Sequence, residues 1–299
     1  MPTFEYPLAL PTVSGQTVSV DAMLQNPTRI TRYLSDLALR GYWADQVFSN
    51  AGGVSGGAVV YNQLVANELF VAPGRDVMNV EPGAEFPIVT FDRPVPLVKP
   101  VEKFGGKYFI TDEARDRNDP QMLQQGTQRL ANTINRRIHD TAVAELDAQI
   151  TALAGNAQTA TANNWGAVVT GGASQTNATG WPAADFAKVQ LLADQKELGV
   201  VFDTWILNPA DANDFNIVYG ENANQVLRNH GIRFITTNRV PVGTGYVIES
   251  GQVGQARLEK PLTTETWREQ GTQRTWIQSD VRPVFIVTNP YSIAKVTLP

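Results

Sequence analysis

One pentapeptide of the 299-residue chain matches a catalytic pattern. Gly53-Val54-Ser55-Gly56-Gly57 fits G-x-S-x-G, in which a nucleophilic serine stands on a sharp turn between a buried strand and a helix. Here a polar segment precedes the motif and the strand-like run 58–64 follows it, which reverses the required context. The partner histidine would be His230, which lies in a polar, Asn-rich stretch. We therefore interpret the motif as a flexible glycine hinge and keep a serine hydrolase using Ser55 as an alternative function.

Other side chains suited to catalysis or metal binding are scarce. The chain has no cysteine, which excludes disulfides, thiolate ligands and cysteine nucleophiles, and its only imidazoles are His139 and His230. His139 falls in the middle of a long helical pattern without a second ligand at helical spacing, so we interpret it as a packing or surface residue. We expect no catalytic residue, no cofactor and no metal, and a protein that is not an enzyme.

Composition and charge narrow the class of protein further. Hydrophobic residues make up 42% and charged residues 18% of the chain, which is typical of a folded globular protein. The net charge of -5 lacks the strong basic excess of a dedicated nucleic-acid binder. We recognise neither a basic leader segment nor an apolar run near 18 residues, so we expect a soluble protein made in a cytoplasm, without contact to a membrane.

The clearest predicted element is a helix over residues 120–154. Asp119 suits the N-cap and Pro120 the first helical position, while Gly155 ends the pattern. Glu145 and Asp147 fall outside its apolar stripe, and we expect them to be solvated. A coiled coil is the competing interpretation, but steps of four residues drift away from a strict heptad. The stripe consists of Leu123, Leu130, Ile134, Ile138, Ala142, Leu146, Ile150 and Leu153.

Two segments before this helix are expected to lack a core of their own. Residues 1–55 contain one short helical pattern, 27–40, among extended Pro-, Thr- and Gly-rich sequence, and we interpret this region as an arm. Residues 81–100 contain five prolines, which cannot donate to a sheet ladder and so indicate edge or isolated strands. A two-stranded excursion of this kind is only marginally stable by itself, so its partner is predicted to be another chain.

The second half of the chain predicts short helices and longer strands. Helices are expected at 182–198 and 210–219, a strand at 200–207, and a hairpin built from 233–237 and 245–250. Acidic residues such as Asp112 are expected to be solvated. Three long strands are predicted to complete the chain, at 256–267, 274–288 and 292–298.

The order of these elements resembles that of one protein family. The return from the family's extended loop into its spine helix is resembled by Phe109-Ile110-Thr111-Asp112-Glu113-Ala114. The start of its axial domain is resembled by Trp205-Ile206-Leu207-Asn208-Pro209 together with Gly231-Ile232-Arg233-Phe234. The C-terminal strands of the family are resembled by Val281-Arg282-Pro283-Val284-Phe285-Ile286-Val287 together with Pro290-Tyr291-Ser292-Ile293-Ala294. Together, the arm, long hairpin, long helix and compact domain look like the Hong Kong 97-type major capsid protein of tailed bacteriophages.

The resemblance implies an α+β fold and a division of the chain. It implies a structural protein that self-assembles into hexamers and pentamers of an icosahedral shell, with a location in the virion after assembly in the host cytoplasm. The shell would enclose double-stranded DNA without sequence-specific binding, and separate scaffolding, portal and decoration proteins are possible partners. The division implied is 1–55 as N-terminal arm, 56–110 as extended loop, 111–200 with 256–288 as peripheral domain carrying the spine helix, and 201–255 with 289–299 as axial domain.

The same resemblance suggests where neighbouring subunits meet. Arg75 and Asp76 at the loop tip, together with Arg29 and Arg32 in the arm, are the candidate intersubunit contacts. Some family members join subunits through a lysine on the extended loop, but the first lysine here is Lys99, so we expect a shell held by non-covalent contacts. The family's long N-terminal scaffolding segment is missing, which implies a separate scaffolding protein or none. An encapsulin-type compartment shares the fold and is kept as an alternative.

Overall fold

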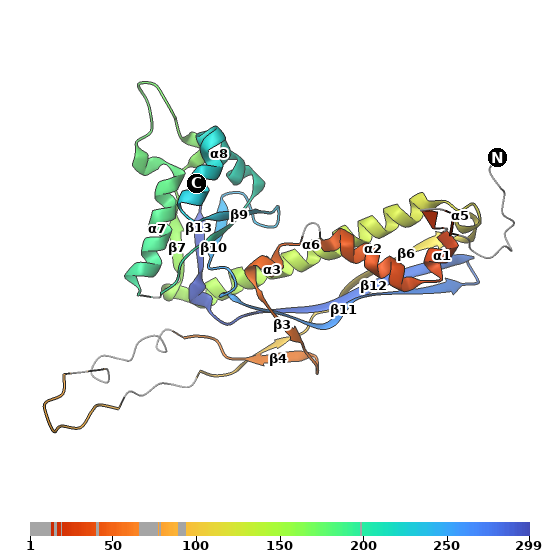
Figure 1. Cartoon of the computed structure of the whole chain (residues 1–299), viewed down its shortest axis with the longest axis horizontal. Helices are drawn as coiled ribbons and strands as arrows, with labels where there is room; N and C mark the ends of the chain where they lie inside the picture. The colour runs from red at the N-terminus through yellow and green to blue at the C-terminus, as the bar shows by residue number, and fades with distance from the viewer. Residues whose placement is uncertain are drawn as a thin grey trace.

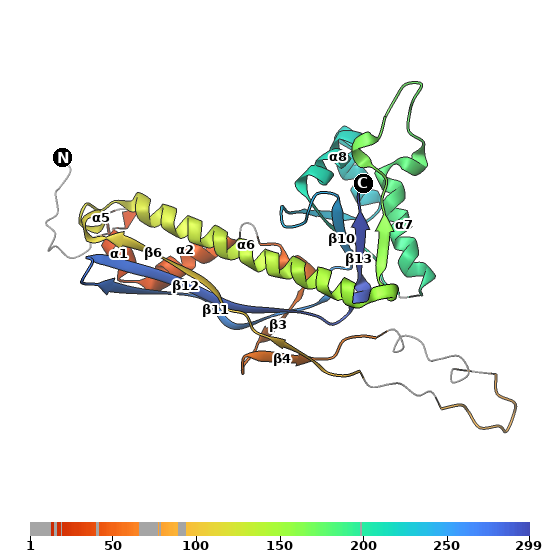
Figure 2. The same cartoon turned by 180° about the vertical axis from the view of Figure 1, so that it is seen from behind.

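The computed structural model describes residues 13–14, 17–18, 20–39, 42–65, 77, 79–88, 94–197 and 199–299. Figure 1 shows an elongated body in which helix α6 (Pro120–Ala152) runs along one face of a long sheet and ends beside a second sheet. The extended loop leaves through β4 (Ala58–Tyr61) and returns through β5 (Leu97–Pro100), and Figure 2 shows it projecting from the opposite face of the long sheet. Helix, two sheets and loop agree with the predicted α+β class.

Helix α6 forms where the sequence predicts it. The Asp119 carboxylate caps its first turn by accepting the Gln121 N–H at 2.9 Å, and Pro120 occupies the position where a missing N–H costs nothing. Its 33 residues span about 50 Å. The predicted apolar stripe is its buried face, since Ala142 and Leu146 are fully buried and pack among residues of both sheets.

The long sheet has four strands in the order β3-β11-β12-β6. Its centre is the antiparallel pair β11–β12, which β6 extends on one side, while β3 pairs with β11 only over Gln255–Leu258. Helices α6 and α2 lie side by side and both pack on the sheet. The bounds are β3 Ser49–Gly53, β6 Phe104–Thr111, β11 Gly254–Glu269, β12 Arg274–Val287, α1 Val20–Leu24, α2 Pro27–Leu39, α3 Ala44–Val47 and α5 Asp112–Asp116.

The N-terminal region, which is expected to lack a core of its own, buries apolar side chains against the rest of its subunit. Ile30 and Leu34 of α2 are fully buried, and Ile30 packs with Ile110 and Ile277 of the long sheet. Farther along, Phe48 joins the core around α6. Residues 20–48 therefore belong to the folded body, because α2 supplies the second helix that the sheet needs to cover its α6 side. Two short strands precede them, β1 Val13–Ser14 and β2 Thr17–Val18.

The second sheet has five strands in the order β7-β13-β10-β8-β9. The hairpin predicted from 233–237 and 245–250 is wrong, because β8, whose four residues are all buried, lies between the two strands and pairs with both. β7 and α7, predicted to be peripheral, also pack with this sheet. The bounds are β7 Gln158–Thr161, β8 Thr204–Leu207, β9 Arg233–Thr236, β10 Thr244–Ile248, β13 Ile293–Thr297, α7 Pro182–Gln195, α8 Pro209–Tyr219 and α9 Ala223–Asn229. Single 3-10 turns lie at Ala154–Asn156, Trp165–Ala167, Ala178–Gly180, Gly220–Asn222 and Pro290–Ser292.

The buried face of α6 leads to a first prediction. Leu146→Asp places a carboxylate without a partner into the core shared by both sheets, which costs roughly 3 kcal/mol or more. We expect the variant to be insoluble or unfolded on expression, as judged by the soluble fraction and circular dichroism. Ala148→Asp is the matched control, because Ala148 is exposed on the same helix. Equal folding of both variants would show that the buried face is assigned wrongly.

Candidate assembly interface

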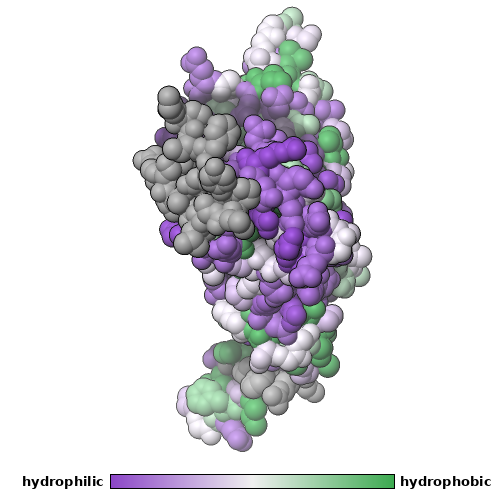
Figure 3. Space-filling view, turned by 90° about the vertical axis from the view of Figure 1, so that its right-hand side faces the viewer, coloured by the Kyte–Doolittle hydropathy of each residue, from purple (hydrophilic) through white to green (hydrophobic). Residues whose placement is uncertain are grey.

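The extended loop carries apolar side chains that its own subunit does not cover. Val77 is 86% exposed, Phe86 80%, Ile88 78% and Val95 80%, and large apolar side chains are normally buried in a folded monomer. Figure 3 views the molecule from the α5 end and shows hydrophobic residues among paler and hydrophilic ones at its lower end, below a body whose centre is largely hydrophilic. The described part of the loop therefore presents an apolar surface that its own subunit leaves uncovered. Arg75 and Asp76 lie outside the described residues, so their role remains a prediction.

The base of this loop is fixed to the long sheet. Val59 of β4 packs on Val284 and Ile286, which point away from α6. The Gly57 N–H donates to the Glu259 carboxylate at 3.0 Å, and this carboxylate also accepts from Arg282 at 3.1 Å. The turn Gly53–Gly57 connects strand β3 to strand β4, which is not the strand-to-helix turn of a nucleophile elbow.

A second attachment joins the loop base to α6. Lys99 of β5 forms an ion pair of 2.5 Å with Glu145, whose side chain is only 3% exposed. The Gln149 amide donates to the other Glu145 oxygen at 2.9 Å, and the Gln63 amide donates to Gln149 at 2.8 Å. The expectation that Glu145 is solvated is wrong, because its carboxylate is buried and bonded to Lys99 of the loop base and to Gln149 of the same helix. The only sequence signal was its position beside the apolar stripe.

The same part of α6 holds the five-stranded sheet. The Asp147 carboxylate accepts from Lys295 Nζ at 2.6 Å and from the Tyr246 hydroxyl at 2.9 Å. The hydrogen bond from Lys295 lowers the pKa of Asp147, while burial raises the pKa of Tyr246. About two turns of helix earlier, Asp140 pairs with Arg239 at 3.4 Å. Asp147 is thus half-exposed but not free, and it ties α6 to β10 and β13.

His139 attaches the N-terminal region to α6. Its ring stacks on Trp43 with 4.7 Å between ring centroids, and its Nε2 accepts the Trp43 backbone N–H at 3.4 Å. Burial lowers the pKa of His139 to about 4, so the ring is neutral near pH 7 and can accept this bond. His139 is therefore a packing residue, as one of the two interpretations of the sequence predicted.

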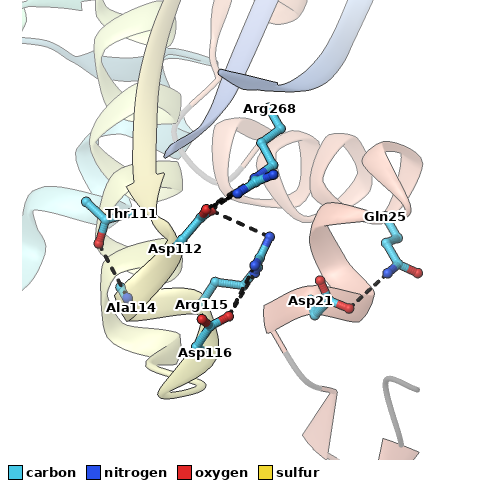
Figure 4. Close-up of polar contacts among 8 residues, drawn as sticks. All are labelled: Asp21, Gln25, Thr111, Asp112, Ala114, Arg115, Asp116 and Arg268. Atoms are coloured by element: carbon cyan, nitrogen blue, oxygen red, sulfur yellow. Dashed lines mark hydrogen bonds and ion pairs between the residues drawn. The ribbon is translucent and has the colours of Figure 1, made fainter. Parts of the chain in front are cut away.

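The far end of the long sheet is held by another carboxylate. Asp112, at the start of α5, accepts from Arg268 Nε of β11 at 3.2 Å and pairs with Arg115 at 3.5 Å (Figure 4). The hydrogen bond from Arg268 lowers the pKa of Asp112. The expectation that Asp112 is solvated is wrong, since the side chain is buried under this arginine. Thr111 caps α5 by accepting the Ala114 N–H at 3.4 Å.

The remaining candidate residues lie apart from one another. Arg29 and Arg32 are exposed on α2, and Ser55 is exposed in the turn between β3 and β4. His230 ends α9 in the second sheet's layer and lies edge-on to Phe186. Among the described residues, no cluster of carboxylates and histidines is arranged to bind a metal. Across the same ranges, no helix has the length and apolar character needed to cross a membrane.

Solved structures with a similar fold are capsids and related particles. A virus-like particle from Pyrococcus furiosus aligns over 90% of this chain and 98% of its own, with 14% identity and a TM-score of 0.56. The capsid of cyanophage P-SCSP1u aligns over 97% and 93%, with 12% identity and a TM-score of 0.54. The mature capsid of bacteriophage PhiM1 aligns over 86% of each chain, with 12% identity and a TM-score of 0.52. The chain therefore has the Hong Kong 97-type capsid fold.

The sequence places the chain in a family of the same kind. Residues 95–296 match the family described as phage capsid protein, and this stretch is more than half of the chain. The chain belongs to that family and is a structural major capsid protein with its place in the virion shell. The encapsulin alternative has less support, because the family match is to phage capsids. No curated protein matches the sequence.

The ion pair between Lys99 and Glu145 gives a second prediction. Lys99→Met leaves a buried carboxylate without its cation and should cost about 3 kcal/mol, since removing one member of a buried pair is costly. Adding Glu145→Gln should recover most of this loss, because the amide needs no counter-ion and can still bond to Gln149. We would measure unfolding in denaturant together with protease cleavage at residues 62–65. Additive effects of the two substitutions would mean that the pair does not anchor the loop.

Proposed function

We propose that copies of this chain assemble into the hexamers and pentamers of an icosahedral shell through the extended loop. The observation that supports this most directly is the set of exposed apolar side chains on a loop whose base is rigidly held. Burying one such side chain is worth about 1.5–3 kcal/mol, and folding of the single subunit leaves that free energy unused. Contact with a neighbouring copy would supply it, and the anchors at Glu145 and Glu259 would fix the direction in which the loop reaches.

We further propose that the five-stranded sheet and its helices form the axial domain, around which capsomer copies meet. Residues 148–184 contain no Asp, Glu, Lys or Arg. Their exposed part around 168–177 projects from the end of the molecule beside α8 (Figure 1). Close to a symmetry axis, the same residue of every subunit lies near its copies, so a charge there would be repeated around the axis and would repel its own kind. An uncharged projection avoids that repulsion.

The charge of the chain and its family support a proposal about the contents and partners of the shell. We propose that it encloses double-stranded DNA without sequence-specific contacts, since 29 acidic against 24 basic residues favour a wall that does not grip nucleic acid. Assembly takes place in the host cytoplasm, with separate scaffolding, portal and decoration proteins as partners. The role is structural and not enzymatic, and the exposed turn around Ser55 serves as a hinge.

The test of assembly removes the outer part of the loop. Deleting residues 66–85 should leave a folded subunit, because the described anchors of the loop lie outside this range, but shells should no longer form in negative-stain images. Phe86→Ser with Ile88→Ser should have the same direction of effect and raise the concentration needed for assembly more than about tenfold. Asn79→Ala, an exposed polar change in the same stretch, is the control. Normal shells from the deletion variant would refute this use of the loop.

The way the shell is held together can be tested separately. The sequence has no lysine before Lys99, and Lys99 lies at the loop base beside Glu145, so the outer loop offers no amine for a covalent bond between subunits. Particles boiled in denaturing detergent should run as one band near 32.7 kDa. A ladder at pentamer and hexamer sizes would instead reveal a covalent link from another lysine.

A further inference from the structure

The helical layer, formed by α2 and α6 on one side of the long sheet, differs in charge from the rest of the chain. The whole chain has 29 acidic and 24 basic residues, whereas α2 and residues 120–137 of α6 together contain five arginines and one acid, Asp36. We call the exposed side of these two segments, which points away from the sheet, the basic face. The arginines of the two segments are Arg29, Arg32, Arg129, Arg136 and Arg137.

The packing of the two helices turns four of these arginines away from the core. Ile30 of α2 and Leu123 of α6 are buried in one apolar cluster against the sheet, and Figure 1 shows both helices on the side opposite the extended loop. Arg137 turns toward the sheet, where its guanidinium lies 5.7 Å from the centre of the Phe104 ring. The open sides of the helices carry the other four, Arg29, Arg32, Arg129 and Arg136, and all of them are exposed.

The four exposed arginines have no anionic partner in the described part of the chain. The described arginines that pair with carboxylates are others, namely Arg115, Arg239, Arg268, Arg274 and Arg282. Acids farther along α6 are already engaged, because Asp140 pairs with Arg239 and Asp147 pairs with Lys295. The cations of the basic face are therefore available to an anion from outside the subunit.

The arginines follow one another along the helical layer. Ile30 packs with Leu123, and the Asn135 amide donates to the Ala38 carbonyl at 3.0 Å, so α2 and α6 run in the same direction. The arginines of α2 thus lie beside the first turns of α6, and the two on α6 come later. Together they span about 20 Å, which is the length of about six base pairs of double-stranded DNA.

The uncharged side chains of the basic face suit the same ligand. Arginine and the side-chain amides of glutamine and asparagine are common donors to phosphate oxygens, and such contacts carry no sequence information. No acid interrupts this stretch of α6, so nothing on it repels a phosphate. The exposed amides between residues 120 and 137 belong to Gln121, Gln124, Gln125, Gln128 and Asn132.

We propose that the basic face contacts the phosphate backbone of the double-stranded DNA that the shell encloses. This inference rests on the proposed function and adds to it a surface for the contents of the shell. It requires that the helical layer lines the inside of the shell. Since the acidic excess of the chain lies outside this layer, the wall as a whole still repels DNA, and the contact is confined to the basic face.

Binding of duplex DNA to the unassembled full-length subunit, followed by fluorescence anisotropy, tests the inference. Arg129→Gln with Arg136→Gln should weaken binding at least about tenfold at about 50 mM salt and lower the slope of log K against log salt by about 2. Two duplexes of unrelated sequence should give the same result. The matched control is Lys103→Gln with Lys107→Gln, which removes two exposed lysines beside Asp280 and Trp276 of the long sheet.

The same measurements decide between DNA and other occupants of the basic face. Equal affinity of the arginine and lysine variants, or no salt-dependent binding by the parent chain, would refute the inference. Poly-glutamate should compete at least about tenfold less well than duplex DNA, because its charges are more widely spaced. If it competes equally well, an acidic protein segment is the occupant and the assignment to DNA is refuted.

Assembly separates this inference from the proposal on which it rests. The arginine variant should melt with the parent chain and form normal shells, and closed shells should bind less added duplex than the same mass of subunits. A variant that folds but no longer assembles would make the arginines subunit contacts and overturn the inference. If the parent chain forms no shells, self-assembly is refuted, while the comparison on subunits still decides whether the basic face binds DNA.

Discussion

The arrangement of the subunit depends on a short stretch of α6, residues 139–149, where the helix is bonded to every other part. His139 accepts the backbone N–H of Trp43, Glu145 holds Lys99 of the extended loop, and Asp147 binds Lys295 of the five-stranded sheet. These contacts lie within about three helical turns. Because a hydrogen-bonded helix barely deforms over that distance, the N-terminal region, the loop and both sheets take fixed positions relative to one another. The base of the loop therefore leaves the body in a fixed direction.

The exposed apolar side chains of the subunit lie on the extended loop, away from its core. The core around Leu146 buries the apolar face of α6. Phe86 and Ile88, by contrast, stay exposed when the single chain folds, so their burial adds no free energy to its folding. In the proposed assembly, burial of the exposed apolar side chains of the loop would supply free energy for association, whereas the core around Leu146 supplies free energy for folding. This separation lets a subunit fold before it assembles. Of the two carboxylates that hold the loop base, Glu145 is buried and Glu259 is half-buried.

Local sequence signals were enough to predict the helices and strands. The wrong predictions concern residues whose structure depends on partners far away in the sequence. The cap at Asp119 and the apolar stripe sufficed for α6, because both act within one helix. The prediction of a hairpin from 233–237 and 245–250 was wrong because strand β8, which lies between the two strands, comes from earlier in the chain. The sequences of the two strands do not indicate that β8 pairs with both of them. Glu145 was expected to be solvated because its cation, Lys99, is 46 residues away. Burial of a charge is decided by such partners, and a single sequence does not display them.

The contacts available to this subunit are individually weak, and weak contacts are an advantage for the assembly of a closed shell. An exposed apolar side chain contributes only about 1.5–3 kcal/mol, and the outer loop carries no lysine amine to make a contact permanent. Each subunit in a ring, however, makes the same contacts with neighbours on two sides, so release requires several of them to break together. A misplaced copy makes fewer contacts and leaves, while a correctly placed one is held by all of them. Weak contacts that are repeated by symmetry thus allow misplaced subunits to leave during assembly and still stabilise the closed shell. Both effects require a rigid subunit, and the bonds of α6 supply that rigidity.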